Sequence, residues 1–439
     1  MNKIKASILV IGFQKEDHNM YPHLYDCLQN LRNTYDDVIY VGDGDQHEGL
    51  YSIDSNLRGI LHIFSFKTWL QAFRALFIKF SPYAGRRRRP VEKNEDANIK
   101  HDGNLAETID FRIFLLAGKF LVNRLCSVVT SFVSYVRRQR RLRKNLKNVR
   151  FKYDKRLVLA IDHTSCFAAE KYFPGKVVLW SFDILTKDYP MRIKNGFLER
   201  PTTSKDALRA RALIIQDEQR KKLLEESIGV TFPNTIYLPV SLNDSEFCRK
   251  ASESRQKKTS FATVNIVQSG WIVKNRWSDK LIDEYQNWPT WYKLNLRGFI
   301  GSDIRSKLLN IKRMPYLSES IYDNTRLPEI LNNHDIGFVG YAEKDSNHKY
   351  IENASAQLVN FLRLGLPVIG CGSPLFNDFV TKQNIGIGVS PTEETEGAIR
   401  KIIDNYSFFS HNARRLYESR YNLNSHFDKY LIKSFESLL

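Results

Sequence analysis

One stretch, residues 355–370, restricts the fold of this chain more than any other. Apolar residues recur there at helical spacing, at Leu358, Phe361 and Leu362. Gly365 is able to end that helix in the left-handed conformation, and Pro367 prevents a return to helix before a short apolar strand. A helix, a glycine turn and a strand in this order indicate an α/β domain, where such junctions lie near the ligand-binding edge of the sheet. An ordinary helix end that leads into any α/β strand explains the same residues.

The first half of the chain alternates short apolar runs with helical segments. A helix is predicted over Tyr21–Leu31, and each predicted strand ends in glycine or a polar loop. The predicted strands span Ala6–Phe13, Asp37–Asp43, Gly59–Phe66, Arg156–Asp162, Lys176–Asp183, Ala212–Asp217 and Thr235–Val240. This alternation predicts a doubly wound parallel sheet. The loop after the first strand lacks Gly-x-Gly-x-x-Gly, so a dinucleotide site there is not supported.

A second alternation of strands and helices begins at Val264–Ile272. Further strands are predicted at Leu294–Ile300, Met314–Leu317, Asp335–Val339 and Gly386–Val389. Because 439 residues exceed what one hydrophobic core usually supports, we expect two domains. The segment from Asn243 to Lys258 is rich in Ser, Lys and Glu and is the predicted linker. The expected domains are therefore residues 1–242 and 261–439, joined by residues 243–260.

The chain is strongly basic, with a formal net charge of +18. This charge favours an anionic partner, which is a phosphorylated substrate, an anionic membrane or a nucleic acid. The five cysteines are scattered and form no Cys-x-x-Cys pair, so a reducing compartment is favoured over disulfides or a zinc site. We expect neither a signal peptide nor a transmembrane helix, since no uninterrupted apolar run of about 18 residues occurs.

Residues 67–155 are a basic, helical insertion within the predicted first domain. Aromatic and aliphatic residues between Trp69 and Phe80 precede Arg86–Arg89, and a long helix is predicted over Phe111–Val136. Eleven basic residues follow in 137–156. The combination favours attachment to an anionic membrane, although helices that cover the sheet beside solvated charges explain it too. Nucleic acid is not expected, because the aromatic residues are not interleaved with the basic cluster.

Asp43, Asp45 and His47 are close enough in the sequence to suggest a metal site. Aspartate and glycine are also the usual residues of a solvated turn, which explains this segment without a metal. We therefore expect that no metal binds there.

Seven residues separate Glu352 from Asn360, and a Gly-Leu-Pro-Val turn begins five positions later at Gly365. This segment resembles the donor-binding element of two-domain GT-B glycosyltransferases, especially glycosyltransferase family four, in which two glutamates precede a Gly-x-Pro-Val turn. The resemblance implies that Glu352 and Asn360 line the donor site, with position 360 accepting hydrogen bonds from the ribose. Asn360 departs from the family, because its amide accepts and donates but brings no charge. Gln357 is a second departure, since some relatives carry lysine there.

Three further residues match the part of the family that holds the donor phosphates. Gly270 lets backbone N–H groups approach a diphosphate, to which a following helix presents its positive N-terminus. Lys274 and Arg276 match the family's cation a few residues beyond this glycine. Such a cation stabilises the charge that a departing nucleoside diphosphate gains. Two exposed basic residues in a basic protein are the alternative interpretation.

Polar residues at strand ends of the first domain match the acceptor side of the family. By that match Asp162, His163 and Asp183 are the expected catalytic residues, one of them near the acceptor hydroxyl. Each also suits an ordinary helix N-cap or a strand-end turn, so both interpretations stay open. Relatives send their last helix back to the first domain, and Tyr417–Leu439 is long enough to do so.

We therefore expect an α/β protein of the GT-B fold, with two doubly wound Rossmann-like domains that face each other across a cleft. The expected activity is transfer of a hexose from a UDP- or GDP-sugar to a hydroxyl of a glycan or lipid-linked glycan. The resemblance implies no cofactor beyond this donor substrate, no metal and a retaining outcome. The expected location is cytoplasmic, at the inner face of the plasma membrane. A catalytically decayed binding subunit and a nucleotide-sugar epimerase are the alternatives, and the basic insertion argues against the epimerase.

Overall fold

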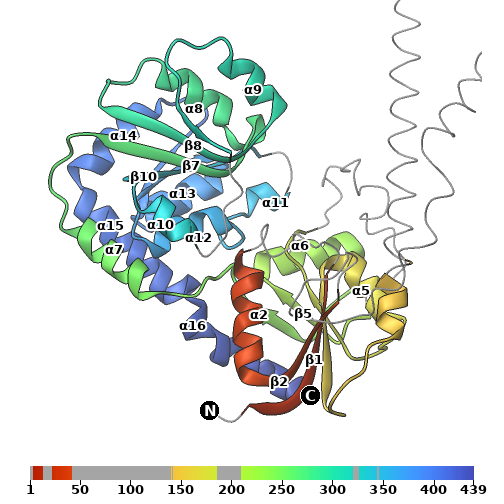
Figure 1. Ribbon diagram of the computed structural model, residues 1–439. Coiled ribbons are helices and arrows are strands. Elements are labelled where there is room, and N and C mark those ends of the chain that lie inside the picture. The colour runs from red at the N-terminus through yellow and green to blue at the C-terminus, as the bar shows by residue number, and fades with distance from the viewer. Residues whose placement is uncertain are drawn as a thin grey trace, which may run out of the picture. The chain divides into compact units, whose positions relative to one another are not determined.

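The computed structural model describes residues 3–12, 22–41, 140, 142–184, 209–319, 326–343 and 346–439 (Figure 1). These residues belong to one compact unit, which comprises residues 1–45 and 128–439. None of residues 46–127, the other unit, is described. Several sequence predictions lie outside the described residues: the strand Gly59–Phe66, the helix Phe111–Val136, the turn at residues 43–47 and the basic run Arg86–Arg89.

The first sheet has six described strands, all parallel, in the order β2-β1-β3-β4-β5-β6. They are β1 (Ile4–Ile11), β2 (Tyr35–Val41), β3 (Arg156–Ile161), β4 (Val177–Trp180), β5 (Ala212–Ile215) and β6 (Thr235–Tyr237). Their near-continuous buried Val, Ile and Leu residues are typical of a parallel sheet covered on both faces. All six overlap strands predicted from the sequence.

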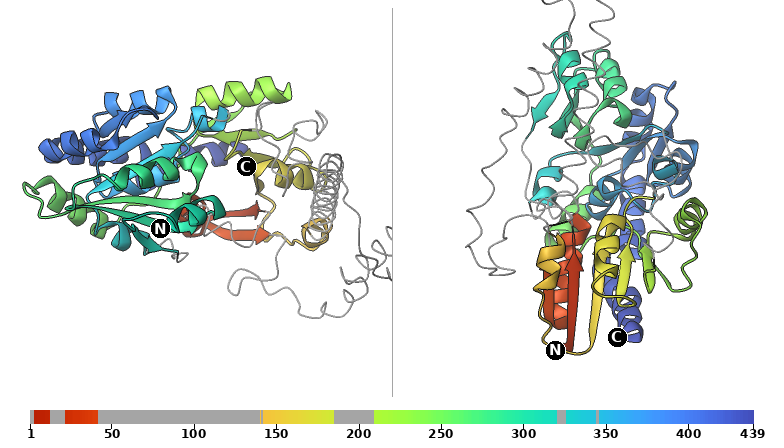
Figure 2. Two further views of the ribbon diagram at one scale, coloured as in Figure 1. Left: turned by 90° about the horizontal axis from the view of Figure 1, so that it is seen from above. Right: turned by 90° about the vertical axis from the view of Figure 1, so that its right-hand side faces the viewer.

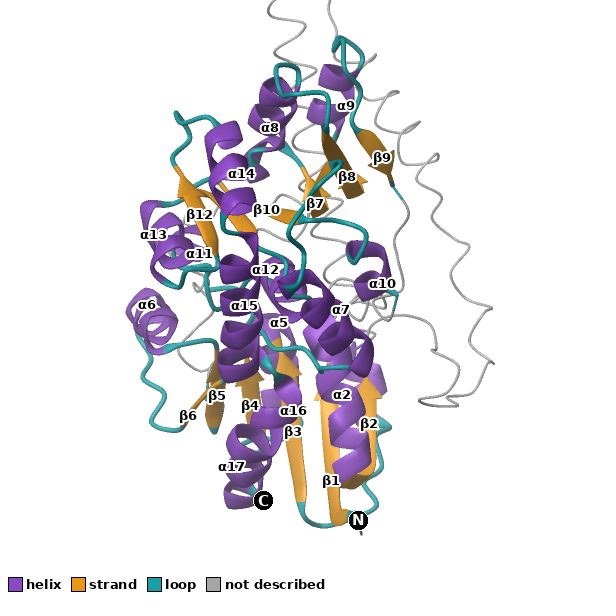
Figure 3. Ribbon diagram, turned by 90° about the vertical axis from the view of Figure 1, so that its left-hand side faces the viewer, coloured by secondary structure: helices purple, strands orange, loops and turns teal. Residues whose placement is uncertain are grey.

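Helices cover both faces of the first sheet. One face carries α2 (Pro22–Thr34) together with the last segments of the chain, α16 (Leu423–His426), η4 (Phe427–Ile432) and α17 (Lys433–Leu438). The other face carries α5 (Asp162–Glu170) and α6 (Glu218–Ile228). Figure 3 shows α2, α16 and α17 on the same side of the strands, and Figure 2 shows the C-terminus at the end of this sheet where β1 begins. Segments from opposite ends of the sequence therefore share one core.

The second sheet is also parallel and six-stranded, in the order β12-β11-β10-β7-β8-β9. Its strands are β7 (Val264–Ile272), β8 (Tyr292–Ile300), β9 (Tyr316–Ser318), β10 (Ile336–Tyr341), β11 (Val368–Gly372) and β12 (Gly386–Val389). The strand order reverses between β7 and β10, and this switch point is where open α/β sheets bind ligands.

Two layers of helices enclose the second sheet. Helices α8 (Ser278–Tyr285), α9 (Ser302–Leu308) and α14 (Thr395–Asp404) pack in one core cluster with β7 and β8. The other cluster contains α7 (Glu246–Gln256), α10 (Leu327–Leu331), α12 (Ala356–Arg363), α13 (Pro374–Lys382), α15 (Tyr406–Leu416) and the π-helix η3 (Tyr417–Tyr421). Two short elements, η2 (Lys274–Arg276) and α11 (Ser346–Lys349), lie close to the carboxyl ends of the strands in the sequence.

The helix, glycine turn and strand predicted over residues 355–370 are confirmed. Ser355 caps α12 by accepting a hydrogen bond from the backbone of Leu358, and Gly365 has a φ of +65° before β11 begins. A Cβ at Gly365 would stand 2.5 Å from Ser252 Oγ. Both the backbone conformation and the close contact with α7 therefore require glycine.

The segment predicted as a linker is mostly helical. Ser245 caps α7, and this helix packs against α15 and α12. Its buried residues are Cys248, Ala251, Ser252 and Arg255. These side chains make no hydrophobic stripe of the kind that predicts a packed helix, so the composition suggested a solvated segment instead.

Candidate functional site

The three predicted catalytic residues meet at the carboxyl ends of β3 and β4. Asp162 follows β3 with a φ of 62°, an uncommon conformation for a residue other than glycine. Its Oδ1 accepts a hydrogen bond from the backbone of Phe182 at 3.2 Å. His163 Nε2 lies 3.4 Å from Ser181 Oγ, and this hydroxyl donates to the carbonyl of Asp183 at 2.9 Å. His163 is thus linked through Ser181 to the backbone of Asp183, and Asp162 is linked to the adjacent Phe182.

Burial affects the basicity of His163. It lowers the pKa of this imidazole to about 4, although a hydrogen bond with the backbone of Asp183 opposes the shift. The ring is therefore neutral near pH 7. Because a general base works best with a pKa near the operating pH, His163 is better suited to orient Ser181 than to remove a proton.

Two paired glycines lie near the carboxyl ends of two strands of the second sheet. Gly270 of β7 pairs with Gly298 of β8, and their φ angles are +91° and +128°. A Cβ at Gly298 would stand 2.1 Å from the Gly270 carbonyl oxygen, whereas no atom lies within 4 Å of a Cβ built at Gly270. Gly298 therefore permits the close approach of the strands, and Gly270 leaves its own backbone open. Gly270 lies within β7, two residues before this strand ends at Ile272, and the strand has the predicted range.

Arg276 lies across the switch point of the second sheet. Its guanidinium carbon is 3.9 Å from the ring centroid of Tyr341, the last residue of β10. Its carbonyl accepts a hydrogen bond from Gln268 of β7 at 2.8 Å. A Cβ at Gly340 would stand 2.1 Å from the same carbonyl, so glycine lets η2 pack onto β10. Lys274, on the same turn, is exposed.

Tyr341 connects this arginine to the start of α12. Its hydroxyl lies 2.7 Å from Ser355 Oγ, the N-cap of that helix. A guanidinium and a helix N-terminus are thereby linked at one sheet edge, and both attract phosphate groups. Sequence reasoning missed Tyr341 because it ends an apolar run and has the pattern of a core residue.

Glu352 occupies the turn before α12 and is partly buried. Burial raises the pKa of its carboxyl group, the nearby Asp217 adds to the rise, and Arg420 and Arg220 oppose it. Its Oε2 is enclosed and accepts no hydrogen bond from the described part of the chain. An unpartnered buried carboxylate oxygen is uncommon and marks this turn as a place where a ligand group could supply the missing donor.

The side chains of Gln357 and Asn360 are engaged by the fold. Gln357 Nε2 donates to the carbonyl of Phe338 at 3.0 Å. Asn360 is 3% exposed, and its amide donates to Ala356 and accepts from Arg363, each at 2.9 Å. Position 360 is enclosed because α12 is covered on more than one side. The structure therefore gives the Asn360 amide a role within the helix and does not direct it toward a ligand.

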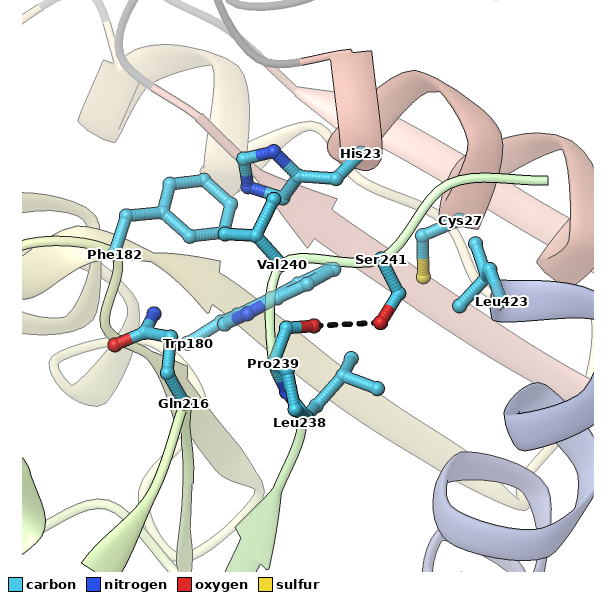
Figure 4. Close-up of a pocket in the computed structure, with 10 residues that line it drawn as sticks. All are labelled: His23, Cys27, Trp180, Phe182, Gln216, Leu238, Pro239, Val240, Ser241 and Leu423. Atoms are coloured by element: carbon cyan, nitrogen blue, oxygen red, sulfur yellow. Dashed lines mark hydrogen bonds between the residues drawn. The ribbon is translucent and has the colours of Figure 1, made fainter. Parts of the chain in front are cut away.

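A small cavity lies beneath the carboxyl ends of β4 and β5 (Figure 4). It has a volume of about 10 Å³, which is room for at most one water molecule. His23 of α2 packs edge-on against Phe182, with ring centroids 4.6 Å apart, and burial lowers its pKa to about 3. The cavity is too small for a sugar or a nucleotide, so it is a packing feature beside the site.

Two buried polar residues that sequence reasoning missed join the carboxyl edges of the two sheets. Arg220 of α6 is 1% exposed and Asn347 of α11 is 4% exposed, and they are hydrogen-bonded to each other. Arginine and asparagine are usually exposed, so their residue types carry no signal of such a position.

Over the described ranges, no helix is long and apolar enough to cross a membrane, and no group of three or more His, Cys, Asp or Glu is arranged to hold a metal.

No family model and no curated sequence matches the chain. Solved structures match it over nearly its full length. HepE from Anabaena, in complex with UDP-glucose, is 13% identical, with 98% of this chain and 99% of HepE covered and a TM-score of 0.55. Sucrose-phosphate synthase from Thermosynechococcus elongatus is 11% identical, with 99% of each chain covered and a TM-score of 0.57. A glycosyltransferase from Rickettsia africae ESF-5 is 11% identical, with 99% of this chain and 98% of that one covered and a TM-score of 0.53. The chain therefore has the GT-B fold that its sequence predicts.

Proposed function

We propose that the protein is a glycosyltransferase that transfers a hexose from a UDP- or GDP-sugar to a hydroxyl of a glycan or lipid-linked glycan. The observation that carries the proposal is the connection from Arg276 through Tyr341 to Ser355, which links a guanidinium and a helix N-terminus at the switch point. The HepE structures contain UDP-glucose, UDP with glucose, and UDP, which supports a nucleotide sugar as the ligand.

In this mechanism the second sheet binds the donor. The open backbone at Gly270 and the cations Lys274 and Arg276 receive the diphosphate and stabilise its growing charge as the sugar leaves. Glu352 accepts a hydrogen bond from a hydroxyl of the transferred sugar. We further propose that these groups make a metal unnecessary and that the sugar keeps its anomeric configuration.

The first sheet serves the acceptor in the same mechanism. Asp162 or Asp183 lies near the acceptor hydroxyl, and His163 orients the segment through Ser181. The support is the hydrogen-bonded group at the ends of β3 and β4, where the φ of Asp162 is an uncommon one.

Calorimetry with UDP and GDP tests the donor site. Arg276→Ala removes a charge-assisted contact and should weaken binding by roughly 1.5–3 kcal/mol, about 10- to 150-fold. Arg305→Ala is the matched control. This exposed arginine of α9 pairs with Glu319, and its replacement removes the same positive charge from the protein. Equal affinity in wild type and Arg276→Ala would contradict the site.

A scan of UDP- and GDP-hexoses for hydrolysis, with and without a chelator, tests the activity. The proposed chemistry would be supported by release of nucleotide that persists in chelator. The first product seen by NMR should also keep the anomeric configuration of the donor. Nucleotide binding without turnover of any donor would instead favour the binding subunit.

We also propose that the basic insertion attaches the protein to the anionic inner face of the plasma membrane. Each basic residue contributes about 1 kcal/mol near an anionic bilayer, within a screening length of about 10 Å. The protein should sediment with phosphatidylglycerol vesicles but not with phosphatidylcholine vesicles, less so in high salt or after Arg86–Arg89 are replaced by serine. The control replaces four exposed basic residues elsewhere, Lys222, Lys250, Lys382 and Arg400. Equal sedimentation with both vesicle types would refute the attachment.

A further inference from the structure

A fully buried arginine lies between the segments that hold the candidate catalytic and donor-binding residues. All five N–H groups of the Arg220 guanidinium donate to carbonyl oxygens. Nε donates to Gln216 at 2.6 Å, Nη1 to the backbone of Asn347 at 3.4 Å and of Tyr350 at 2.9 Å, and Nη2 to the backbone of Phe182 at 2.9 Å and to Asn347 Oδ1 at 3.0 Å. One side chain therefore binds the ends of β4 and β5 and the segment 347–350.

Asn347 extends this link to the segment that contains Asp183. Its amide donates to the carbonyl of Ile184 and accepts from the backbone N–H of the same residue, each at 2.7 Å. Gln216, which also binds Arg220, donates to the carbonyl of Ser181 at 2.8 Å. The segment 181–184 is thus held by three buried polar side chains.

The first turn of α6 makes a second connection, next to Glu352. Asp217 caps α6 by accepting from the backbone of Arg220 at 2.8 Å, and its other oxygen accepts from Asn353 Nδ2 at 2.8 Å. The carbonyl of Asn353 accepts from the backbone of Val240 at 2.8 Å. The same helix turn therefore holds the residue that follows Glu352.

We propose that Arg220 is a positioning residue for the transfer reaction, which fixes the segment of Asp162, His163 and Asp183 relative to the turn that carries Glu352. The proposal rests on the proposed function for what these two segments bind. Arginine suits this role because its planar fork reaches several acceptors at fixed angles, which the single ammonium of lysine does not. Burial of a charged group costs free energy, and the hydrogen bonds made by every guanidinium N–H offset that cost.

The test compares turnover with nucleotide affinity in Arg220→Lys. Misplacement of reacting groups by about 1 Å costs on the order of 100-fold in rate. We expect kcat to fall at least tenfold, while the Kd for UDP or GDP stays within twofold. The calorimetric stoichiometry counts folded molecules, so partial unfolding is not mistaken for slow chemistry. Asn347→Ser, which keeps Arg220 but removes the contact with Ile184, should show the same split.

Arg255→Lys is the matched control. Arg255 is also buried, at 7% exposure, and donates to the backbone and side-chain oxygens of Asn332 at 2.6 and 3.0 Å, away from both segments. Its kcat should equal that of the wild type. Wild-type kcat in folded Arg220→Lys and Asn347→Ser would overturn the proposal, as would a parallel loss of nucleotide affinity. Failure of both variants to fold would also overturn it, because the pair would then be purely stabilising.

A measurement without turnover separates this proposal from the proposed function. If the wild type turns over no donor, the proposed function fails. The positioning role is then decided by the distance between two spin labels. The labels are attached to cysteines introduced by Lys155→Cys and Lys382→Cys, in a protein in which Cys126 is replaced by serine. A broader distance distribution in Arg220→Lys supports the role, and an unchanged distribution overturns it.

Discussion

The carboxyl edges of the two sheets are built in opposite ways. At the first sheet, polar side chains bind the backbone and one another: Asp162 accepts from the backbone N–H of Phe182, His163 contacts Ser181, and all five N–H groups of Arg220 donate hydrogen bonds. At the second sheet, the decisive feature is the absence of side chains, at Gly270, Gly298 and Gly340. The first edge therefore depends on polar bonds that hold side chains in place, and the second depends on backbone segments that approach closely.

The largest loss of unfolding free energy should come from adding one methyl group at the carboxyl edge of the second sheet. Gly298→Ala places a Cβ 2.1 Å from a backbone oxygen at a φ that alanine rarely adopts, which should cost about 2–4 kcal/mol of unfolding free energy. Gly397→Ala is the control, because Gly397 lies in α14 with open space around it and should gain about 0.5–1 kcal/mol. Urea unfolding measures both. A Gly298→Ala variant as stable as wild type would remove the steric account of this edge.

The first edge should respond to acid through His23, which packs against Phe182. Burial lowers its pKa to about 3, so below pH 6.5 the unfolded chain binds a proton that the folded chain does not. The folded state therefore loses up to about 1.4 kcal/mol for each pH unit between 6.5 and 3. His23→Leu should remove about 2–3 kcal/mol of the stability loss between pH 6.5 and 4.5. Equal pH dependence of unfolding in His23→Leu and the wild type would refute this assignment.

A smaller loss of stability is expected at Asn360, a buried polar residue in α12 of the second-sheet half. Asn360→Leu removes the acceptor that the described residues provide for the buried Arg363 guanidinium and should cost about 1–3 kcal/mol of unfolding free energy. Because the Asn360 amide is enclosed, the affinity for UDP or GDP should change by less than twofold. Asn310→Leu, at an exposed position in the second-sheet half, is the control for stability. A tenfold loss of nucleotide affinity in Asn360→Leu would restore the ribose role that the family resemblance implies.

The sequence predicted those parts of the fold that depend on apolar periodicity and on glycine. The helix, turn and strand at residues 355–370 and strand β7 follow the predicted ranges closely. Helix α7 was missed because small and polar residues make its buried face. Arg220 and Asn347 carry no local signal, since their burial depends on partners more than 100 positions away in the chain. Family spacing placed Asn360 in the donor site, and that spacing carries no signal of the buried, hydrogen-bonded amide that tertiary packing creates.

The covering of the first sheet by α16, η4 and α17 has a consequence for synthesis on the ribosome. Leu423, Phe427, Leu431 and Phe435 fill the same core as β1 and β3, and Arg211 donates a hydrogen bond to the carbonyl of Leu438. The strands of that sheet are therefore made long before the side chains that close one of their faces. During translation the part of that face not covered by α2 stays open until the second sheet has emerged, and an exposed apolar surface of this kind is what chaperones bind. The half of the molecule made first should thus be the half that finishes folding last.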